Sequence, residues 1–372
     1  MPLIVSLLLV AIPLYVSERL LSAIVSPGLA CLLAVIVLVP ALALVRLAMR
    51  ARRATGARLG RQLAWAGLLL MSLFSSLFVL TLLRDLALLG LLLASFSQFD
   101  AWTAPSALLV LALALLVTAI GLYAARRPRI ARVDIPISNL HAGLRGFSIV
   151  QISDVHVGPT IRRGFVQQLV GRVNALGADV VAITGDLVDG SVSQLANHTA
   201  PLSGLTARHG VFFVTGNHEY YSDEPAWSAE VARLGIRVLK NEHVVVRYAG
   251  ADLVIAGVTD ASAHHFDPAQ RSDPARALAG APRGATRILL AHQPSAASAA
   301  AAAGYDVQLS GHTHGGQFWP WNLLIRFFQP FSAGLHRLER LWVYVNRGTG
   351  YWGPPNRFGV RGEITQIRLV PA

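Results

Sequence analysis

Apolar residues form long unbroken runs in the first third of the chain, whereas later apolar runs are short and separated by polar clusters. Three runs, at residues 29–49, 63–83 and 104–124, have the roughly 20 residues that a helix needs to cross a bilayer core. A fourth run, at residues 3–25, is interrupted by Glu18 and Arg19. With three spans following it and no small-residue cleavage site, this run is interpreted as a membrane helix and not as a secretory signal. The pattern predicts about four transmembrane helices within residues 1–125.

Positive charge gathers beside these runs and sets the expected sidedness. The net charge is +12, and most of it comes from arginines that close or follow the runs at residues 29–49 and 104–124. Arginine-rich short loops mark the cytoplasmic side, so four spans with a cytoplasmic N-terminus place both clusters and the following domain in the cytoplasm. The excess charge therefore points to a membrane surface and not to nucleic acid. Residues 86–96 are apolar but short for a span, and are interpreted as an interfacial or re-entrant piece. If they cross instead, the sidedness changes.

The pattern of apolar and polar residues changes in the second part of the chain. Residues 126–145 are rich in arginine and proline and are interpreted as a basic linker. Short apolar runs typical of buried strands then alternate with helical patterns. The expected strands are residues 147–152, 180–184, 211–215, 253–258, 288–291 and 307–310, and the expected helices are residues 165–176, 226–234 and 294–303. This alternation predicts an α/β domain over residues 146–372, with strands covered on both faces.

Polar residues with metal-binding side chains follow five of these strands. In chain order they are Asp154 and His156; Asp186; Asn217, His218 and Glu219; His292; and His312 and His314. Each group alone is ordinary, because a Gly-Asp turn or a hydrogen-bonded histidine is common. Ligands in α/β sheets bind outside the carboxyl ends of strands, so the ordered set predicts one shared site.

The donor types indicate which ions this site accepts. The only cysteine, Cys31, lies inside an apolar run, so a disulfide framework and a thiolate metal site are both excluded. Carboxylate, amide oxygen and imidazole suit Mn, Fe, Zn or Mg. Two such cations about 3.5–4 Å apart can clamp a phosphoryl group and activate water. Holding them so close requires an anionic bridge, and Asp186 is placed to provide it.

The ordered motifs Asp-x-His, Gly-Asp, Gly-Asn-His-Glu, His and Gly-His-x-His resemble those of the calcineurin-like metallophosphoesterases, over residues 146–372. The resemblance implies a four-layer sandwich of two mixed β-sheets flanked by helices. It also implies two divalent metal ions. The first would be bound by Asp154, His156, Asp186 and His314, and the second by Asp186, Asn217, His292 and His312. His218 would act as general acid toward the leaving oxygen or would stabilise the transition state, and Glu219 would orient His218.

Further motifs resemble the bacterial membrane-bound branch of this family. They are His218-Glu219-Tyr220-Tyr221, His314-Gly315-Gly316-Gln317 and the stretch from Arg357 to Glu363, in which Gly362 replaces an expected proline. Arg357 is a candidate for binding substrate phosphate through bidentate hydrogen bonds. The resemblance implies an integral protein of the bacterial inner or plasma membrane.

The expected function is hydrolysis of a phosphomonoester, phosphodiester or pyrophosphate bond, with a phospholipid or nucleotide-lipid among the candidate substrates. Two alternatives stay open, namely a membrane-tethered cytoplasmic nucleotide phosphodiesterase and a non-catalytic receptor or scaffold. The aromatic stretch at residues 318–328 is either a segment capping the core or a bilayer contact. The sequence does not identify the metal, the substrate or the oligomeric state.

Overall fold

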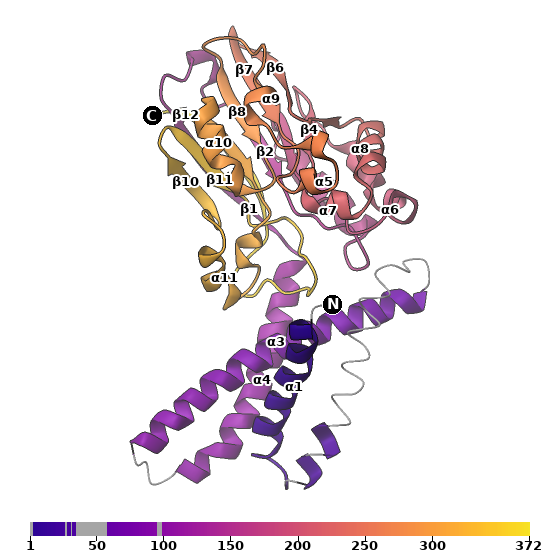
Figure 1. Cartoon of the computed structure of the whole chain (residues 1–372), viewed down its shortest axis with the longest axis vertical. Helices are drawn as coiled ribbons and strands as arrows, with labels where there is room; N and C mark the ends of the chain where they lie inside the picture. Colours follow the sequence, from indigo (N-terminus) through magenta and orange to yellow (C-terminus); the bar gives the residue numbers. More distant parts are fainter. Residues whose placement is uncertain (1–2, 27, 31, 35–57, 95–98) are drawn as a thin grey trace. The chain divides into compact units, whose positions relative to one another are not determined.

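The computed structural model describes residues 3–26, 28–30, 32–34, 58–94 and 99–372 (Figure 1). Its contacts divide the chain into two compact units. One comprises Met1–Tyr123 together with Gly353–Phe358, and the other comprises Ala124–Trp352 together with Gly359–Ala372. The first unit is helical and the second is built on β-sheets, as the change in the pattern of apolar and polar residues predicts.

The helical unit contains α1 (Leu3–Leu21), α3 (Arg58–Leu93) and α4 (Phe99–Ala125). Among the described residues, two helices are long and apolar enough to cross a membrane, with mean hydropathies of 2.2 in α3 and 2.6 in α4. They contain the predicted spans at residues 63–83 and 104–124. The predicted span at residues 29–49 falls mostly outside the described residues.

The prediction of a separate interfacial piece at residues 86–96 is wrong for its described part, because α3 continues without a break to Leu93. At 1.5 Å per residue this 36-residue helix is about 54 Å long, more than a bilayer core requires. The charged pair that suggested a break is satisfied inside the unit. Arg84 Nη1 lies 3.1 Å from Asp85 Oδ1, and Arg84 Nε donates to Ser106 Oγ of α4 at 2.9 Å.

Asp85 also connects α3 to α1. Its Oδ2 accepts hydrogen bonds from the Tyr15 hydroxyl and from Arg19 Nε, each at 2.7 Å. Within a bilayer the hydrophobic effect does not hold helices together, because lipid tails are as apolar as the side chains. Hydrogen bonds between helices can then support their association. Arg19, which interrupts the first apolar run in the sequence, is therefore part of the polar cluster that joins the helices.

Replacing Asp85 with Asn tests this cluster. The change removes the negative charge facing Arg84, whose side chain is only 5% exposed. We expect the helical unit to lose about 1 kcal/mol of stability, the size typical of interhelical polar contacts in membranes. Heat-induced loss of the far-ultraviolet helical signal in detergent would report it. Asp100→Asn, at the exposed start of α4, is the control. Equal melting of the two variants would contradict the assignment.

The second unit contains two six-stranded sheets. In the first, the strand order is β1 (Arg129–Ile137), β12 (Glu363–Pro371), β2 (Ser148–Ile152), β3 (Val180–Thr184), β4 (Val211–Val214) and β5 (Arg237–Val238). In the second, it is β10 (Gly334–Leu338), β11 (Leu341–Val345), β9 (Val307–Ser310), β8 (Thr286–Leu290), β7 (Ala251–Gly257) and β6 (Glu242–Tyr248). Each sheet mixes parallel and antiparallel pairs, with β2, β3 and β4 mutually parallel, as are β7, β8 and β9.

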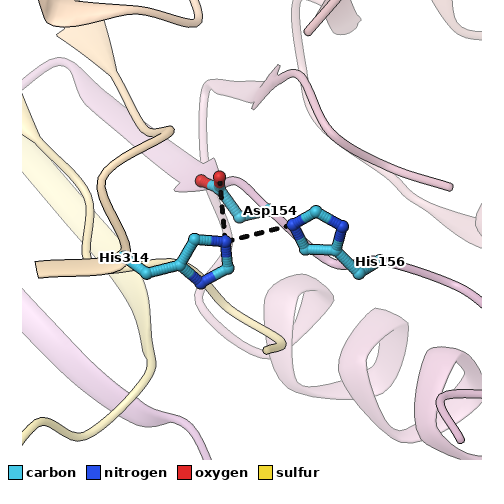
Figure 2. A group of neighbouring side chains, drawn as sticks. All are labelled: Asp154, His156 and His314. Carbon is cyan, nitrogen blue, oxygen red and sulfur yellow. Dashed lines mark hydrogen bonds and ion pairs between the residues drawn. The ribbon is translucent and has the colours of Figure 1, made fainter. Parts of the chain in front are cut away.

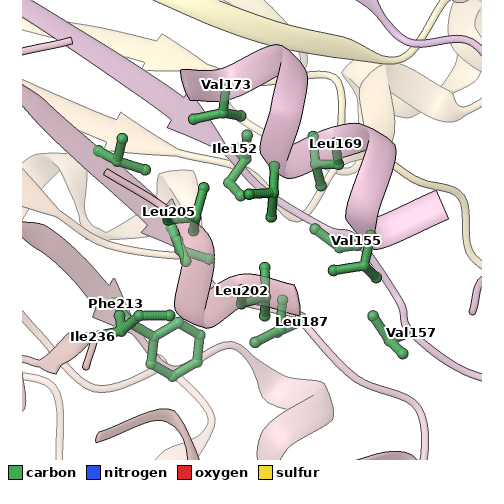
Figure 3. Close-up of a cluster of buried hydrophobic side chains, with 14 of the residues drawn as sticks. Ile152, Val155, Val157, Leu169, Val173, Leu187, Leu202, Leu205, Phe213 and Ile236 are labelled. Atoms are coloured by element: carbon green, nitrogen blue, oxygen red, sulfur yellow. The ribbon is translucent and has the colours of Figure 1, made fainter. Parts of the chain in front are cut away.

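Successive side chains of these strands enter different cores, because they point to opposite faces of the sheet. Ile149 of β2 packs between the two sheets, whereas Val150 packs outward against α5 (Arg163–Asn174), α6 (Val192–Thr199) and α8 (Glu224–Arg233). Figure 3 shows part of this outer cluster. The second sheet packs outward against α9 (Pro274–Ala277) and α10 (Ala297–Ala303). The predicted four-layer sandwich is confirmed.

The predicted linker contains a strand. Within residues 126–145, β1 pairs in parallel with β12 along nine residues. Ile135 and Ile137 are buried, whereas Arg129 is exposed. Pro136 is compatible with this strand because β1 lies at the edge of its sheet, where a missing N–H is tolerated. The arginines and the proline obscure the alternation of apolar and polar residues that would have predicted this strand.

Candidate metal centre

The loops after five strands bring the predicted ligands together. Asp154, Asp186 and Asn217 follow β2, β3 and β4 of the first sheet, and His292 and His312 follow β8 and β9 of the second. Neighbouring parallel strands end at the same edge of a sheet, so their loops converge there. The site therefore lies where the carboxyl ends of strands from both sheets face one another.

The first group of donors consists of Asp154, His156 and His314 (Figure 2). Each offers one ligand atom, and these atoms lie within 4.8 Å of one another. His314 Nε2 lies 3.4 Å from Asp154 Oδ1 and 3.1 Å from His156 Nε2. All three residues are buried, so the carboxylate and two ring nitrogens meet away from solvent. This is a compact donor set for one divalent cation.

The second group consists of Asp186, His292 and His312. The Nδ1–H of His292 donates to the Thr184 carbonyl at 2.7 Å, which leaves its Nε2 as the ligand nitrogen. That Nε2 is buried and lies 3.1 Å from Asp186 Oδ2, but the contact is not aligned as a hydrogen bond, and the atom has no hydrogen-bond partner among the described residues. Asn217 Oδ1 joins this group, 3.1 Å from His312 Nδ1. A buried nitrogen without a partner fits a metal ligand.

Asp186 faces both groups. Besides its contact with His292, its Oδ2 lies 3.9 Å from His156 Nε2 and 3.9 Å from His218 Nε2. Burial alone would raise the pKa of Asp186, but the charges of His292, His218 and His156 outweigh burial and hold it well below its usual value. The carboxylate is thus kept ionised, as a group bridging two cations must be.

The backbone is strained at the ligand positions. Five of the residues named above have φ between 51° and 70°, namely Asp154, His156, Asp186, His312 and His314. The left-handed conformation costs roughly 1–2 kcal/mol for a residue with a side chain. Such strain persists only where the surrounding structure fixes it, and it clusters at functional sites.

Gly185 shows how closely these loops are packed. Its φ is +86°, and a Cβ there would lie 2.7 Å from both Gly216 N and His292 Nδ1. Any side chain at this position would push apart two of the loops that carry donors. The glycine before Asp186 is therefore required by space as well as by conformation.

His218 is positioned by a residue that the sequence did not predict. Its Nδ1 lies 2.6 Å from Asp189 Oδ1, and the same oxygen lies 3.1 Å from His156 Nδ1. Asp189 is held in place because its backbone N–H donates to the Val157 carbonyl at 2.9 Å. The only signal in the sequence was a second Asp three residues after Asp186, in a stretch that reads as a turn.

The charges of this pair favour a proton on His218. Burial raises the pKa of Asp189, but His156 and His218 outweigh it and hold the pKa well below its usual range. Burial lowers the pKa of His218, but Asp189 and Asp186 outweigh this and raise it above the usual value. The imidazolium form is thereby stabilised next to Asp186, as a general acid requires.

The Glu219 carboxylate contacts backbone groups, and its predicted role in orienting His218 stays a prediction. It accepts hydrogen bonds from the N–H groups of Gly216 at 2.6 Å, Leu187 at 2.8 Å and Asp186 at 3.0 Å. These bonds join the loop after β3 to α7 (Asn217–Tyr221) after β4. Burial and the negative charge of Asp186 raise the pKa of Glu219 to about 8, although hydrogen bonds from backbone N–H groups lower it.

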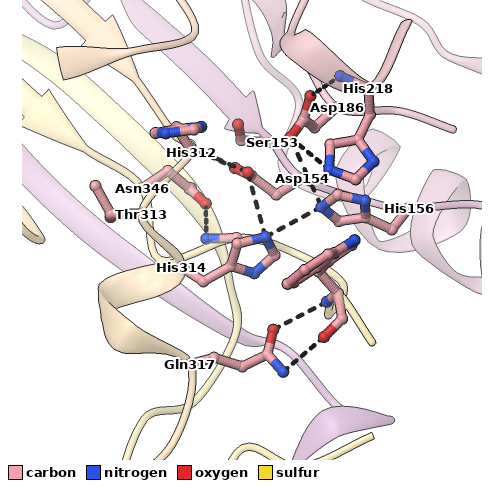
Figure 4. Close-up of polar contacts among 12 residues, drawn as sticks. Ser153, Asp154, His156, Asp186, His218, His312, Thr313, His314, Gln317 and Asn346 are labelled. Atoms are coloured by element: carbon pink, nitrogen blue, oxygen red, sulfur yellow. Dashed lines mark hydrogen bonds and ion pairs between the residues drawn. The ribbon is translucent and has the colours of Figure 1, made fainter. Parts of the chain in front are cut away.

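Further contacts order the loop that follows His314 (Figure 4). The Gln317 side chain bonds both backbone groups of Trp352, donating to its carbonyl and accepting from its N–H, each at 2.9 Å. The Trp352 ring lies edge-on to His218, with centroids 5.9 Å apart, and Tyr221 lies edge-on at 5.4 Å. Aromatic side chains therefore contact the histidine on the outer side of the donor groups.

Arg357 belongs to the helical unit. Its backbone N–H donates to the Gly121 carbonyl of α4 at 3.0 Å, and its side chain is buried. A role for Arg357 in binding substrate stays a prediction.

Comparisons with known proteins agree with this geometry. The family model described as calcineurin-like phosphoesterase matches residues 147–316. The "transmembrane protein with metallophosphoesterase domain" of Danio rerio is 40% identical over 309 residues, covering 80% of this chain and 71% of that protein. The Bos taurus protein of the same description is 42% identical over 278 residues, covering 70% and 62%. An uncharacterized metallophosphoesterase of Helicobacter pylori is 37% identical over 250 residues, covering 66% and 65%. The chain thus spans about two thirds of these relatives' lengths.

Metal binding should stabilise the folded protein, because the donor groups converge only in that state. At a free Mn²⁺ concentration 100 times the dissociation constant, the expected gain is about 2.7 kcal/mol for each ion bound. The midpoint of thermal unfolding of the full chain, with and without Mn²⁺, would measure it. His292→Ala should lose most of the shift, whereas His265→Ala, at an exposed position, should keep it. Identical shifts in the two variants would rule out His292 as a ligand.

Proposed function

The chain belongs to the calcineurin-like metallophosphoesterase family, whose members are metal-dependent phosphoester hydrolases, and from this we propose that it hydrolyses a phosphoester bond at a centre of two divalent cations. One observation carries the proposal. The buried carboxylate of Asp186 lies between two groups of metal-binding side chains that come from both sheets.

The donors divide into two sets that share Asp186. Asp154, His156 and His314 would complete the first set, and the second would be completed by Asn217, His292 and His312. This mixture of oxygen and imidazole donors suits Mn, Fe, Zn or Mg. When bound, two such cations neutralise charge on a phosphoryl group and lower the pKa of a coordinated water.

His218 would supply the proton for the leaving oxygen. Its Nδ1 is held by Asp189 at 2.6 Å, so Nε2 is the nitrogen left to face the site, 3.9 Å from Asp186 Oδ2. The side chain is 16% exposed, which leaves it accessible to a substrate. Asp189 acts as a positioning residue, because it fixes the ring and favours its charged form.

The substrate is proposed to carry a phosphomonoester, phosphodiester or pyrophosphate bond on a lipid, for example in a nucleotide-lipid. Two relatives are described as transmembrane proteins, and two helices of this chain are apolar and long enough to span a bilayer. A catalytic domain tethered in this way meets membrane-borne substrates at high local concentration. We place this domain on the cytoplasmic side, which the arginines flanking the predicted spans support.

Hydrolysis of bis-p-nitrophenyl phosphate by the Mn²⁺-loaded protein tests the enzyme proposal. Asp186→Asn should lower kcat about 100-fold or more, because changing a residue that only supports a metal ligand already costs about 10–100-fold in metal affinity or activity, and Asp186 is a ligand itself. Asp134→Asn, which changes an exposed carboxylate on β1, should keep full activity. A wild-type protein that binds Mn²⁺ but releases no nitrophenolate would instead favour a non-catalytic receptor or scaffold.

The role of His218 can be separated from metal binding by the choice of leaving group. His218→Ala should lower kcat about 10²–10⁴-fold for an alkyl phosphodiester, whose leaving oxygen needs a proton. The loss should be smaller for a p-nitrophenyl ester, because nitrophenolate leaves without protonation. Asp189→Asn should show the same dependence more weakly. Equal losses on both substrates, with the metal content unchanged, would contradict proton donation.

A further inference from the structure

An exposed apolar surface lies directly beyond the metal-ligand loop. It consists of α11 (Trp321–Leu324), the following 3₁₀ turn (Ile325–Phe327) and Phe328, and is called here the apolar segment. Phe327 is 70% exposed and Phe328 79%, and three further apolar members are between 37% and 48% exposed: Trp321, Leu323 and Leu324. Within the aromatic stretch at residues 318–328, these exposed side chains favour the bilayer contact over a segment capping the core.

The base of the apolar segment is fixed to the metal-ligand loop. Gly316, two residues after His314, packs so closely on the segment that a Cβ there would lie 2.6 Å from Asn322 N and 2.8 Å from the Trp321 carbonyl. Asn322 N donates to the Phe318 carbonyl at 3.2 Å, and the Phe318 side chain is buried. The segment thus has a buried attachment beside His314 and an exposed outer face.

The composition of that face fits a bilayer interface. Trp321 and the two phenylalanines are types enriched at the headgroup level, where an amphipathic helical segment buries its apolar side chains. Arg326, whose guanidinium lies 5.1 Å from the centre of the Phe327 ring, adds a positive charge suited to lipid phosphate. The domain that carries the segment is also joined to a predicted membrane helix by a short connection, because β1 begins at Arg129, soon after α4 ends at Ala125.

We propose that the apolar segment inserts into the interfacial layer of the bilayer and holds the His314 loop at the lipid surface. A phosphate borne by a lipid would then reach the metal centre without leaving the membrane. This second step rests on the proposed hydrolase function. The insertion itself does not rest on that function, and it can be measured on protein that has no catalytic activity.

Spin-label accessibility in nanodiscs of phosphatidylethanolamine and phosphatidylglycerol tests the insertion on the full chain. Cys31 is the only cysteine, so a Cys31→Ser background allows a single label at Phe328→Cys. Leu324→Cys is a second site in the segment, for use if the first variant folds poorly. Val245→Cys is the matched control, because it replaces an exposed apolar residue on β6, at the opposite edge of the second sheet from β10.

We expect the label at residue 328 or 324 to collide several-fold more with lipid-dissolved oxygen than with water-soluble nickel chelate, and the label at residue 245 to show the reverse. Nickel accessibility at residue 328 equal to that at residue 245 would overturn the proposal. Protection from both reagents would also overturn it, since a partner protein or a second copy would then cover the segment. Nitrophenyl ester hydrolysis by the same samples reports separately on the proposed function.

Discussion

The carboxylate of Asp186 is buried with three imidazole rings facing it, and the arrangement of the surrounding loops follows from the need to keep it there as an anion. Burial of a charge is unfavourable unless opposite charge and hydrogen-bond donors surround it. The protein meets this demand with its own side chains and with backbone N–H groups, including that of His218, which donates to Asp186 Oδ1 at 2.8 Å.

Glu219 extends the same constraint to the backbone. By accepting three N–H groups from two different loops, it fixes the peptide that carries Asp186 relative to the one that carries Asn217. The absence of a side chain at Gly185 lets these loops approach closely. The distances between the metal ligands are therefore set mainly by the packing of the backbone segments that carry them.

Residues with strong local signals could be predicted from the sequence, and those defined only by three-dimensional contacts could not. Strands such as Val180–Thr184 are continuous apolar runs, and each is followed by a donor that a parallel sheet carries to a common edge. Asp189 gives no such signal, because its importance comes from the His156 and His218 rings that approach it from other loops. The backbone contacts of Glu219 could not be predicted for the same reason.

The errors in the fold have a related cause. The strand β1 is half-exposed at a sheet edge, so its arginines and Pro136 outweigh its few buried residues in the local pattern. In α3, the pair Arg84 and Asp85 suggests a break only when read along one helix. Their partners are on α1 and α4, and these contacts allow the helix to continue.

The strand order of the first sheet also affects how the protein is made. Because β12 lies between β1 and β2, β1, the first strand in the chain, gains its neighbour only after nearly all of the domain has left the ribosome. Until then β1 and β2 each present an unpaired edge, and unpaired edges invite wrong pairing and aggregation. Biosynthesis therefore includes an interval in which the edges of β1 and β2 both lack their native partner.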